Sequence, residues 1–154
     1  MTQGINHVSV NARDLRESVA FYVELLGAEP LPAPNFGVPV QWLAVGRTQL
    51  HLFERDLTPL SHHHFGVTVD DLEPAYRAAE RRGAFDREAF GNHLVEIPGD
   101  VVQLYVRDPA GNLVEIDQHG VERLPEDLRS VLQGIWDLRS QDEENMRGRL
   151  FVSS

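Results

Sequence analysis

The chain has 154 residues, 42% of them hydrophobic, and 24 acidic side chains against 14 basic ones, all of which are arginine. This length predicts one globular domain or two small fused modules, and the formal charge of −10 argues against a nucleic-acid partner because it repels phosphates. The lack of cysteine excludes disulfides and thiolate metal sites, so any metal must bind His, Asp, Glu or water.

The first half of the chain begins with an alternating strand around His7 and continues into a helix over residues 15–26. Asp14 and Glu17 form a possible capping box at the start of this helix, and Gly27 ends it. Residues 28–39 hold four prolines, which predicts a loop with a short edge strand. Two strands, over 39–46 and 48–55, follow and are separated at Gly46.

The second half repeats this pattern 57 residues later. His7 matches His64 and Asp14 matches Asp71, the predicted cap of a second helix that ends at Gly83. Three strands follow this helix, over residues 92–97, 101–108 and 112–118. We therefore predict an α+β fold of two βαβββ modules, about 4–57 and 62–118, packed on a shared face.

Residues 119–154 lie outside the repeat. Apolar residues recur here at helical spacing after Pro125, which predicts one C-terminal helix packed on the body or on a partner chain. Its members are Leu124, Leu128, Val131, Leu132, Ile135 and Leu138. The polar segment 141–145 and the last nine residues, 146–154, read as a solvated tail.

Strand register selects the histidines that could bind a metal. Alternate side chains of a strand point to opposite faces, and four strands each carry one good metal ligand opposite their apolar face. These ligands are His7, His51, His64 and Glu115. In the triplet His62–His64, His63 has the register of the apolar face, and His62 lies further out along the chain. A lone strand histidine is more often structural than functional, but four candidates on polar faces, two of them related by the repeat, favour a metal site.

The segments INHVSVNARDLRESVAFYVELLGAEP, LHLF, HFGVTVDDL and VRDPAGNLVEI resemble the vicinal oxygen chelate superfamily over residues 4–118. This superfamily includes glyoxalase I, methylmalonyl-CoA epimerase, extradiol dioxygenases, and fosfomycin and bleomycin resistance proteins. The resemblance implies a cup-shaped mixed sheet around one divalent metal (Zn, Ni, Mn or Fe(II)), bound by the four residues that register selects. Glyoxalase I usually has a carboxylate at the position of His51. Bleomycin-binding members lack the ligands, so their presence here argues for an enzyme.

Three imidazoles and one carboxylate leave two adjacent positions on a six-coordinate ion, which suit two vicinal oxygens of a substrate. We expect a glyoxalase-type lyase or isomerase, with Glu115 as the base implied by the resemblance. Tyr105 is a second candidate for the proton transfer. Gln103 can line the cup as a donor, and Trp42 and Phe53 form either its apolar wall or ordinary core.

The sequence also fits two other functions. His7, His64 and Glu115 alone would make the Fe(II) triad of an extradiol ring-cleaving dioxygenase. A non-catalytic binding protein, such as an antibiotic resistance protein, would use the cup only to hold a small molecule. The lack of lysine makes fosfomycin modification a weaker option, because those relatives use cationic groups for the phosphonate.

The expected partners are a small-molecule substrate and a second copy of the chain, since relatives commonly form homodimers. No segment approaches the roughly 18 apolar residues of a membrane helix, so we expect no membrane partner. The first residues lack the basic and apolar segments of a signal peptide, which predicts a cytoplasmic protein.

Overall fold

The computed structural model describes residues 4–150 and contains two mixed sheets. The first module consists of β1 (His7–Ala12), α1 (Leu15–Leu26), β2 (Glu29–Leu31), β3 (Val40–Val45) and β4 (Thr48–Glu54). Its sheet has the strand order β1-β4-β3-β2, in which β1 and β4 are parallel and the other neighbours antiparallel. The short β2 is the edge strand predicted in the proline-rich segment.

The second module repeats this topology. It consists of β5 (His64–Thr68), α2 (Glu73–Arg82), β6 (Leu94–Ile97), β7 (Val101–Arg107) and β8 (Leu113–His119). Its sheet has the order β5-β8-β7-β6-β9, and β5 is parallel to β8 just as β1 is parallel to β4. The predicted α+β fold of two βαβββ modules is confirmed.

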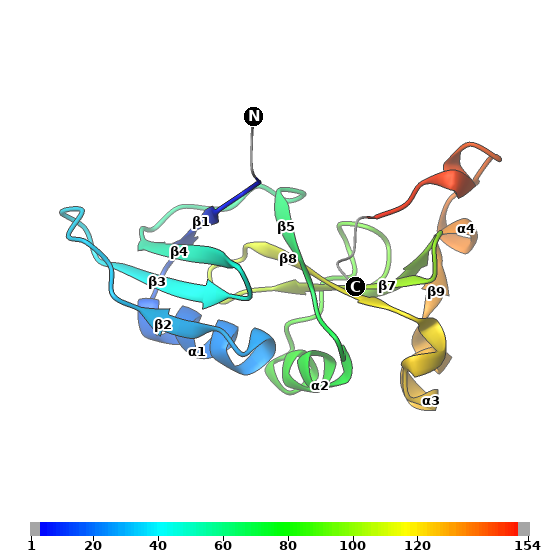
Figure 1. The fold of residues 1–154 in the computed structure, drawn as a ribbon, viewed down its shortest axis with the longest axis horizontal. Coiled ribbons are helices and arrows are strands. Elements are labelled where there is room, and N and C mark those ends of the chain that lie inside the picture. Colours follow the sequence, from blue (N-terminus) through cyan, green and yellow to red (C-terminus); the bar gives the residue numbers. More distant parts are fainter. Residues whose placement is uncertain (1–3, 151–154) are drawn as a thin grey trace.

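The two helices lie on the same side of the sheets and pack against each other (Figure 1). Helix α1 begins as predicted, with the Asp14 side chain accepting the Glu17 backbone N–H, and it ends at Gly27 in the left-handed region. Helix α2 begins one residue later than predicted, because Leu72 is its N-cap and Asp71 accepts the Glu73 N–H just outside the helix.

The helices cover the apolar faces of both sheets, so the modules share one core. Its fully buried members include Leu50, Leu52, Leu104 and Ile116, and burial stabilises each by about 1.5–3 kcal/mol. The opposite faces of the sheets carry no helix of either module, and the candidate site residues lie there.

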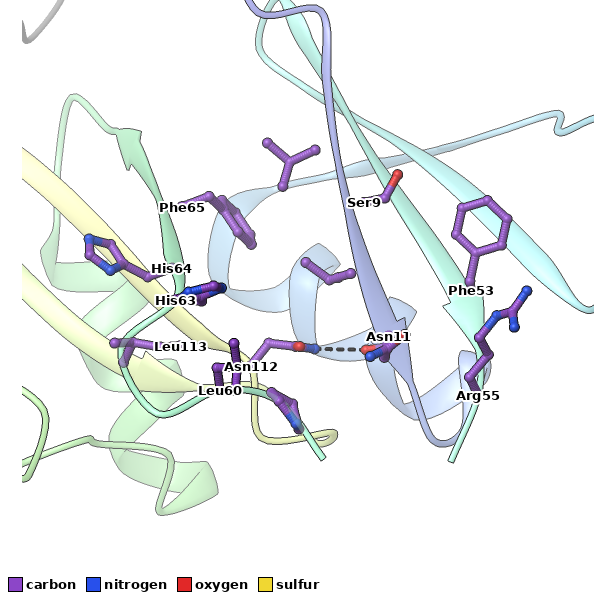
Figure 2. Close-up of a pocket in the computed structure, with 13 residues that line it drawn as sticks. Ser9, Asn11, Phe53, Arg55, Leu60, His63, His64, Phe65, Asn112 and Leu113 are labelled. Carbon is purple, nitrogen blue, oxygen red and sulfur yellow. Dashed lines mark hydrogen bonds between the residues drawn. The ribbon is translucent and has the colours of Figure 1, made fainter. Parts of the chain in front are cut away.

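The turn Asp108–Asn112 fastens the second module to the first. Buried Asp108 accepts the Tyr22 hydroxyl at 2.7 Å and the Asn112 side-chain amide at 2.7 Å. Asn112 also donates to the Asn11 carbonyl of β1 at 2.7 Å, a contact drawn in Figure 2. This polar clamp fixes the position of β1 relative to the turn that leads into β8.

The C-terminal extension is not the single helix predicted from its apolar spacing. After the 3₁₀ turn Val121–Arg123, α3 spans only Glu126–Val131, and the chain then extends through β9 (Gln133–Gly134) before the short α4 (Ile135–Leu138). Strand β9 pairs in parallel with β6, which interrupts the helix and covers that edge of the sheet. Residues 142–150, which include the 3₁₀ turn Asn145–Arg147, are exposed as predicted, and residues 151–154 of the predicted tail lie outside the described residues.

Within residues 4–150, no helix has the length and apolar composition needed to cross a membrane.

Candidate functional site

The backbone register relates the four predicted ligands by an internal twofold. His51 on β4 is paired with Ser9, two residues after His7 on β1. Glu115 on β8 is paired with Gly66, two residues after His64 on β5. Each module therefore presents one ligand from its first strand and one from its last strand, on the face that α1 and α2 leave uncovered.

In the first module the two imidazoles form part of a stack of three rings. The His7 and His51 rings are parallel, with centroids 4.4 Å apart, and the Trp42 indole lies 4.2 Å from His51 on its other side. His51 Nε2 donates to Gln49 Oε1 at 2.9 Å. Burial, together with the charge of His7, lowers the pKa of His51, which favours the neutral imidazole that binds metals.

In the second module His64 faces Glu115, with 3.5 Å between Nε2 and Oε2. His64 Nδ1 donates to the backbone carbonyl of His62 at 2.8 Å, so Nε2 of the neutral ring carries the lone pair. Metal-binding histidines usually have this second hydrogen bond, which fixes the ring and its tautomer. The pair thus offers one nitrogen and one oxygen donor of the types that bind divalent ions.

A buried polar network surrounds Glu115. The Gln103 amide donates to Glu115 Oε1 at 2.7 Å and to Asp117 Oδ1 at 3.2 Å, and the Tyr105 hydroxyl donates to the Gln103 carbonyl at 2.8 Å. Burial and the Glu115 charge raise the pKa of Asp117 to about 8 and raise the pKa of Tyr105. Both groups are therefore protonated in the folded chain at neutral pH.

Asp117 belongs to this network, and the sequence analysis did not select it as a candidate. Its alternation with Glu115 along β8 places the two carboxylates on one face, and Asp117 is only 3% exposed. This alternation is the sequence signal that could have identified Asp117 as a candidate. The sequence does not reveal that the uncovered face is buried at this point. This burial is what raises the pKa of the Asp117 carboxyl group.

The structure brings the predicted ligands together as two pairs. Among residues 4–150, no group of three or more His, Asp or Glu side chains is close enough to hold a metal ion. A cleft of about 470 Å³ lies between the edge strands β1 and β5, and Figure 2 shows Ser9 and Asn11 on one side of it and His63 and His64 on the other. His63 lines this cleft as an exposed side chain and belongs to neither pair.

Trp42 and Phe53 lie with Phe36 in an aromatic cluster on the uncovered face of the first module. The Phe36 ring is 6.1 Å from Trp42 and 5.6 Å from Phe53, and Phe36 is 50% exposed. Neither Trp42 nor Phe53 belongs to the helix-covered core, so they form an accessible apolar wall next to His51.

Comparison with known families agrees with this architecture. Residues 4–116 match the model of the Glyoxalase/Bleomycin resistance protein/Dioxygenase superfamily. The chain belongs to this superfamily. The human mitochondrial methylmalonyl-CoA epimerase is 30% identical to it, and the alignment covers 74% of this chain and 73% of the epimerase.

Two solved structures have the same fold. Lactoylglutathione lyase from Agrobacterium tumefaciens matches with a TM-score of 0.57 and 25% identity, over 77% of this chain and 95% of the lyase. The fosfomycin resistance protein FosX from Listeria monocytogenes, solved with Mn(II) and sulfate, matches with a TM-score of 0.61 over 80% of this chain and 98% of FosX. At 15% identity, the second match concerns the fold alone.

Proposed function

We propose that this superfamily member is a metal-dependent isomerase or lyase that moves a proton on a small substrate bound through two vicinal oxygens. The observation that carries the proposal is the His64–Glu115 pair, in which a correctly oriented imidazole faces a buried carboxylate across 3.5 Å. The similarity to an epimerase and a lyase supports the same class of chemistry.

His7, His51, His64 and Glu115 would together hold one divalent ion. Three neutral imidazoles and one carboxylate suit Zn, Ni, Mn or Fe(II), and they leave room for two substrate oxygens. When bound, the ion supplies a Lewis acid that stabilises the negative charge developing on a substrate oxygen as carbon loses a proton.

The protein's own part is to move that proton. We assign its uptake to Glu115, which would leave the metal to receive the proton as the substrate C–H bond breaks and the electron pair passes toward the carbonyl oxygen. The same group returns the proton to that carbon or to its neighbour, which gives epimerisation or isomerisation. Gln103 stays hydrogen-bonded to Asp117 when Glu115 becomes neutral, so its amide keeps a charged or polar partner throughout. Tyr105 orients Gln103 from the other side.

We further propose that the active form is a homodimer in which each site combines ligands of two chains. The β1 and β5 edges face each other across the cleft without hydrogen bonds, and the two ligand pairs lie on different sheets. A partner that places its first module beside this second module would complete the four-ligand set.

The test loads the full-length protein separately with Zn(II), Ni(II), Mn(II) and Fe(II). Each form is incubated in D₂O with a hemithioacetal and with a 2-methyl-branched acyl thioester, and deuterium incorporation at carbon is followed by NMR. A catechol panel with an oxygen electrode runs in parallel. We expect exchange that Glu115→Gln abolishes and that His63→Ala leaves unchanged.

Catechol cleavage with stoichiometric O₂ uptake in the Fe(II) form would replace this proposal with a dioxygenase. Full small-molecule affinity in metal-free protein would favour a binding protein. For the dimer, His7→Ala and Glu115→Ala chains are mixed after dissociation. Recovery of metal binding in the mixture indicates sites shared between chains, whereas no recovery places each site within one chain.

A further inference from the structure

The second half of the candidate site is covered by the loop between α2 and β6 and by the C-terminal extension, and the extension has no counterpart in the first module. Tyr105, Gln103 and Glu115 lie on the helix-free face, yet they are only 4%, 7% and 7% exposed. Something other than α1 and α2 must exclude water from them. The residues that cover them belong to segments with no role in the proposed proton transfer.

Phe90 lies directly over this part of the site. Its ring centroid is 4.6 Å from Tyr105 and 5.5 Å from the ring of His64, which it meets edge-on. Phe90 belongs to the loop between α2 and β6, and His62 contacts the same loop through the Ala89 carbonyl at 3.2 Å. The ring therefore touches both a predicted metal ligand and the hydroxyl-bearing side chain that orients Gln103.

The C-terminal extension packs against the same buried cluster as Phe90. Ile135 and Leu138 of α4 pack with Phe90 and Ile97 against the buried cluster of Val95, Tyr105 and Leu113. β9 fixes α4 at the sheet edge through its pairing with β6, and the Asn92 side chain donates to the Val131 carbonyl of α3. Figure 1 shows α3, β9 and α4 together at the outer end of the second sheet.

The backbone around α4 is shaped for this packing. The Trp136 ring lies so close to Gly134 that a β-carbon there would sit about 2.2 Å from it, so any other residue would force this ring to move. A β-carbon at Gly91, beside Phe90, would meet Leu138 at 3.9 Å. The extension follows β8 and lies beyond residues 4–116, the part of the chain that matches the superfamily model.

We propose that the C-terminal extension determines substrate size by holding Phe90 as a wall over the second half of the site. This inference rests on the proposed function. The substrate class it predicts is a compact chelator whose substituent is small or extends toward Trp42 and Phe53. Phe90 is the specificity residue, and Ile135 and Leu138 are positioning residues that act through it.

The test measures binding of a hydroxamate series to metal-loaded, full-length protein, because a hydroxamate presents two vicinal oxygens. The probes are acetohydroxamate, benzohydroxamate and 4-phenylbenzohydroxamate. We expect the wild type to bind the smallest probe at least about tenfold tighter than the largest, the scale of steric discrimination in an apolar pocket. In Phe90→Ala, and in the double variant Ile135→Ala with Leu138→Ala, that ratio should fall at least about fivefold.

Val131→Ala is the matched control, because Val131 is in the extension, is 41% exposed and lies outside the cluster. It should keep the wild-type ratio, as should Ile135→Val and Leu138→Met, which preserve the wall. Ile135→Ala alone removes fewer atoms than the double variant and supplies the same readout if the double variant unfolds. A ratio is used because general destabilisation weakens all three probes together.

The outcomes separate the two proposals. A metal-loaded wild type that binds acetohydroxamate, with equal ratios in all variants, overturns the role of the extension and leaves the proposed function standing. A change in Phe90→Ala without a change in the Ile135 and Leu138 variants also overturns it, since the wall would then be independent of the extension. A wild type that takes up no metal, or binds no hydroxamate when loaded, contradicts the proposed function and this inference with it.

Discussion

The two modules have the same backbone plan but line the site with different chemistry. At the position paired with the last-strand ligand, the first module has Trp42 opposite His51 and the second has Tyr105 opposite Glu115. Two residues further along the last strand, Phe53 corresponds to Asp117. One half of the site is thus an apolar wall, and the other is a network that can hold and move a proton. The predicted ligands occupy equivalent positions in the two modules, so we expect both modules to bind the metal and each to contribute differently to substrate binding.

The strand connections differ in the same way. In the first module, β3 and β4 are joined at Gly46 and Arg47, both exposed. In the second, β7 and β8 are joined by the buried turn Asp108–Asn112, which reaches α1 through Tyr22 and β1 through Asn11. The connection between the last two strands is thus an exposed hairpin in the first module. In the second module it is a buried turn that is hydrogen-bonded to the first module.

The prediction with the largest expected effect is that metal binding needs ligands from both modules. His64→Ala and His7→Ala should each weaken metal binding by more than about 100-fold, since loss of a ligand's hydrogen-bond partner alone costs about 10–100-fold. Elemental analysis and competition with a chromogenic chelator measure this. The control is His63→Ala, next to His64 but in neither pair. If His7→Ala retains its metal while His64→Ala loses it, the ion belongs to the second module alone.

The second prediction concerns the two connections. Asp108→Ala should lower the free energy of unfolding by about 3–4 kcal/mol, because it leaves the Tyr22 hydroxyl, the Asn112 amide and the turn's backbone N–H groups without their buried acceptor. Arg47→Ala, in the corresponding exposed turn, should change it by less than about 0.5 kcal/mol. Urea unfolding of metal-free protein gives both numbers. Equal effects would show that the modules are not fastened through this turn.

The third prediction is that acid weakens the second module through His93. This ring is 5% exposed, between Tyr76 and Phe85, and burial, reinforced by the Arg87 charge, lowers its pKa to about 4. Between pH 6.5 and 4 the unfolded chain binds a proton that the folded chain does not. Stability is therefore complete above pH 6.5 and falls as the pH drops, by about 3 kcal/mol in total.

His93→Gln removes this titration and serves as the comparison. Urea unfolding at pH 7, 5.5 and 4.5 should show a smaller loss of stability in the variant than in the wild type, whatever the carboxylates contribute to both. Parallel curves for the two proteins would mean that His93 gains a proton in the folded state as easily as in the unfolded one.

Much of the fold and of the site's register follows from sequence because the signals are local. Alternation places His51 and Glu115 on the uncovered faces, and the repeat relates His7 to His64 without any knowledge of packing. The capping of α1 by Asp14 is likewise a contact within one turn. Such features depend on residues a few positions apart, or on a pattern that occurs twice.

The remaining features depend on contacts between distant segments. Apolar spacing favours a helix through residue 138, but pairing with β6 and the closeness of Trp136 to Gly134 hold the chain extended there. The burial of Asp117 beside Gln103 and Glu115 depends on how β7 and β8 pack together, which no pattern within β8 can indicate. The separation of the two ligand pairs depends on the cleft between β1 and β5.

The prediction with the smallest expected effect compares Gly66 and Ser9, which occupy equivalent positions in the two modules. Gly66 and Ser9 both face the last-strand ligand of their module, but a β-carbon on Gly66 would meet Asp117 Oδ2 at 3.3 Å and Glu115 Oε1 at 3.4 Å. Ser9 already carries a β-carbon and is exposed. The second module thus uses a glycine to admit two carboxylates where the first needs room for one imidazole.

Gly66→Ala should therefore move the carboxylates by a few tenths of an ångström against Gln103, at a cost of about 1–2 kcal/mol, and weaken metal binding up to about tenfold. Ser9→Ala should leave both quantities unchanged. Isothermal titration with Mn(II) and urea unfolding of the two variants measure the difference. If Gly66→Ala binds the metal as well as the wild type, the hydrogen bonds of Gln103 adjust without cost. The carboxyl groups are then not held in the fixed arrangement that proton transfer by Glu115 requires.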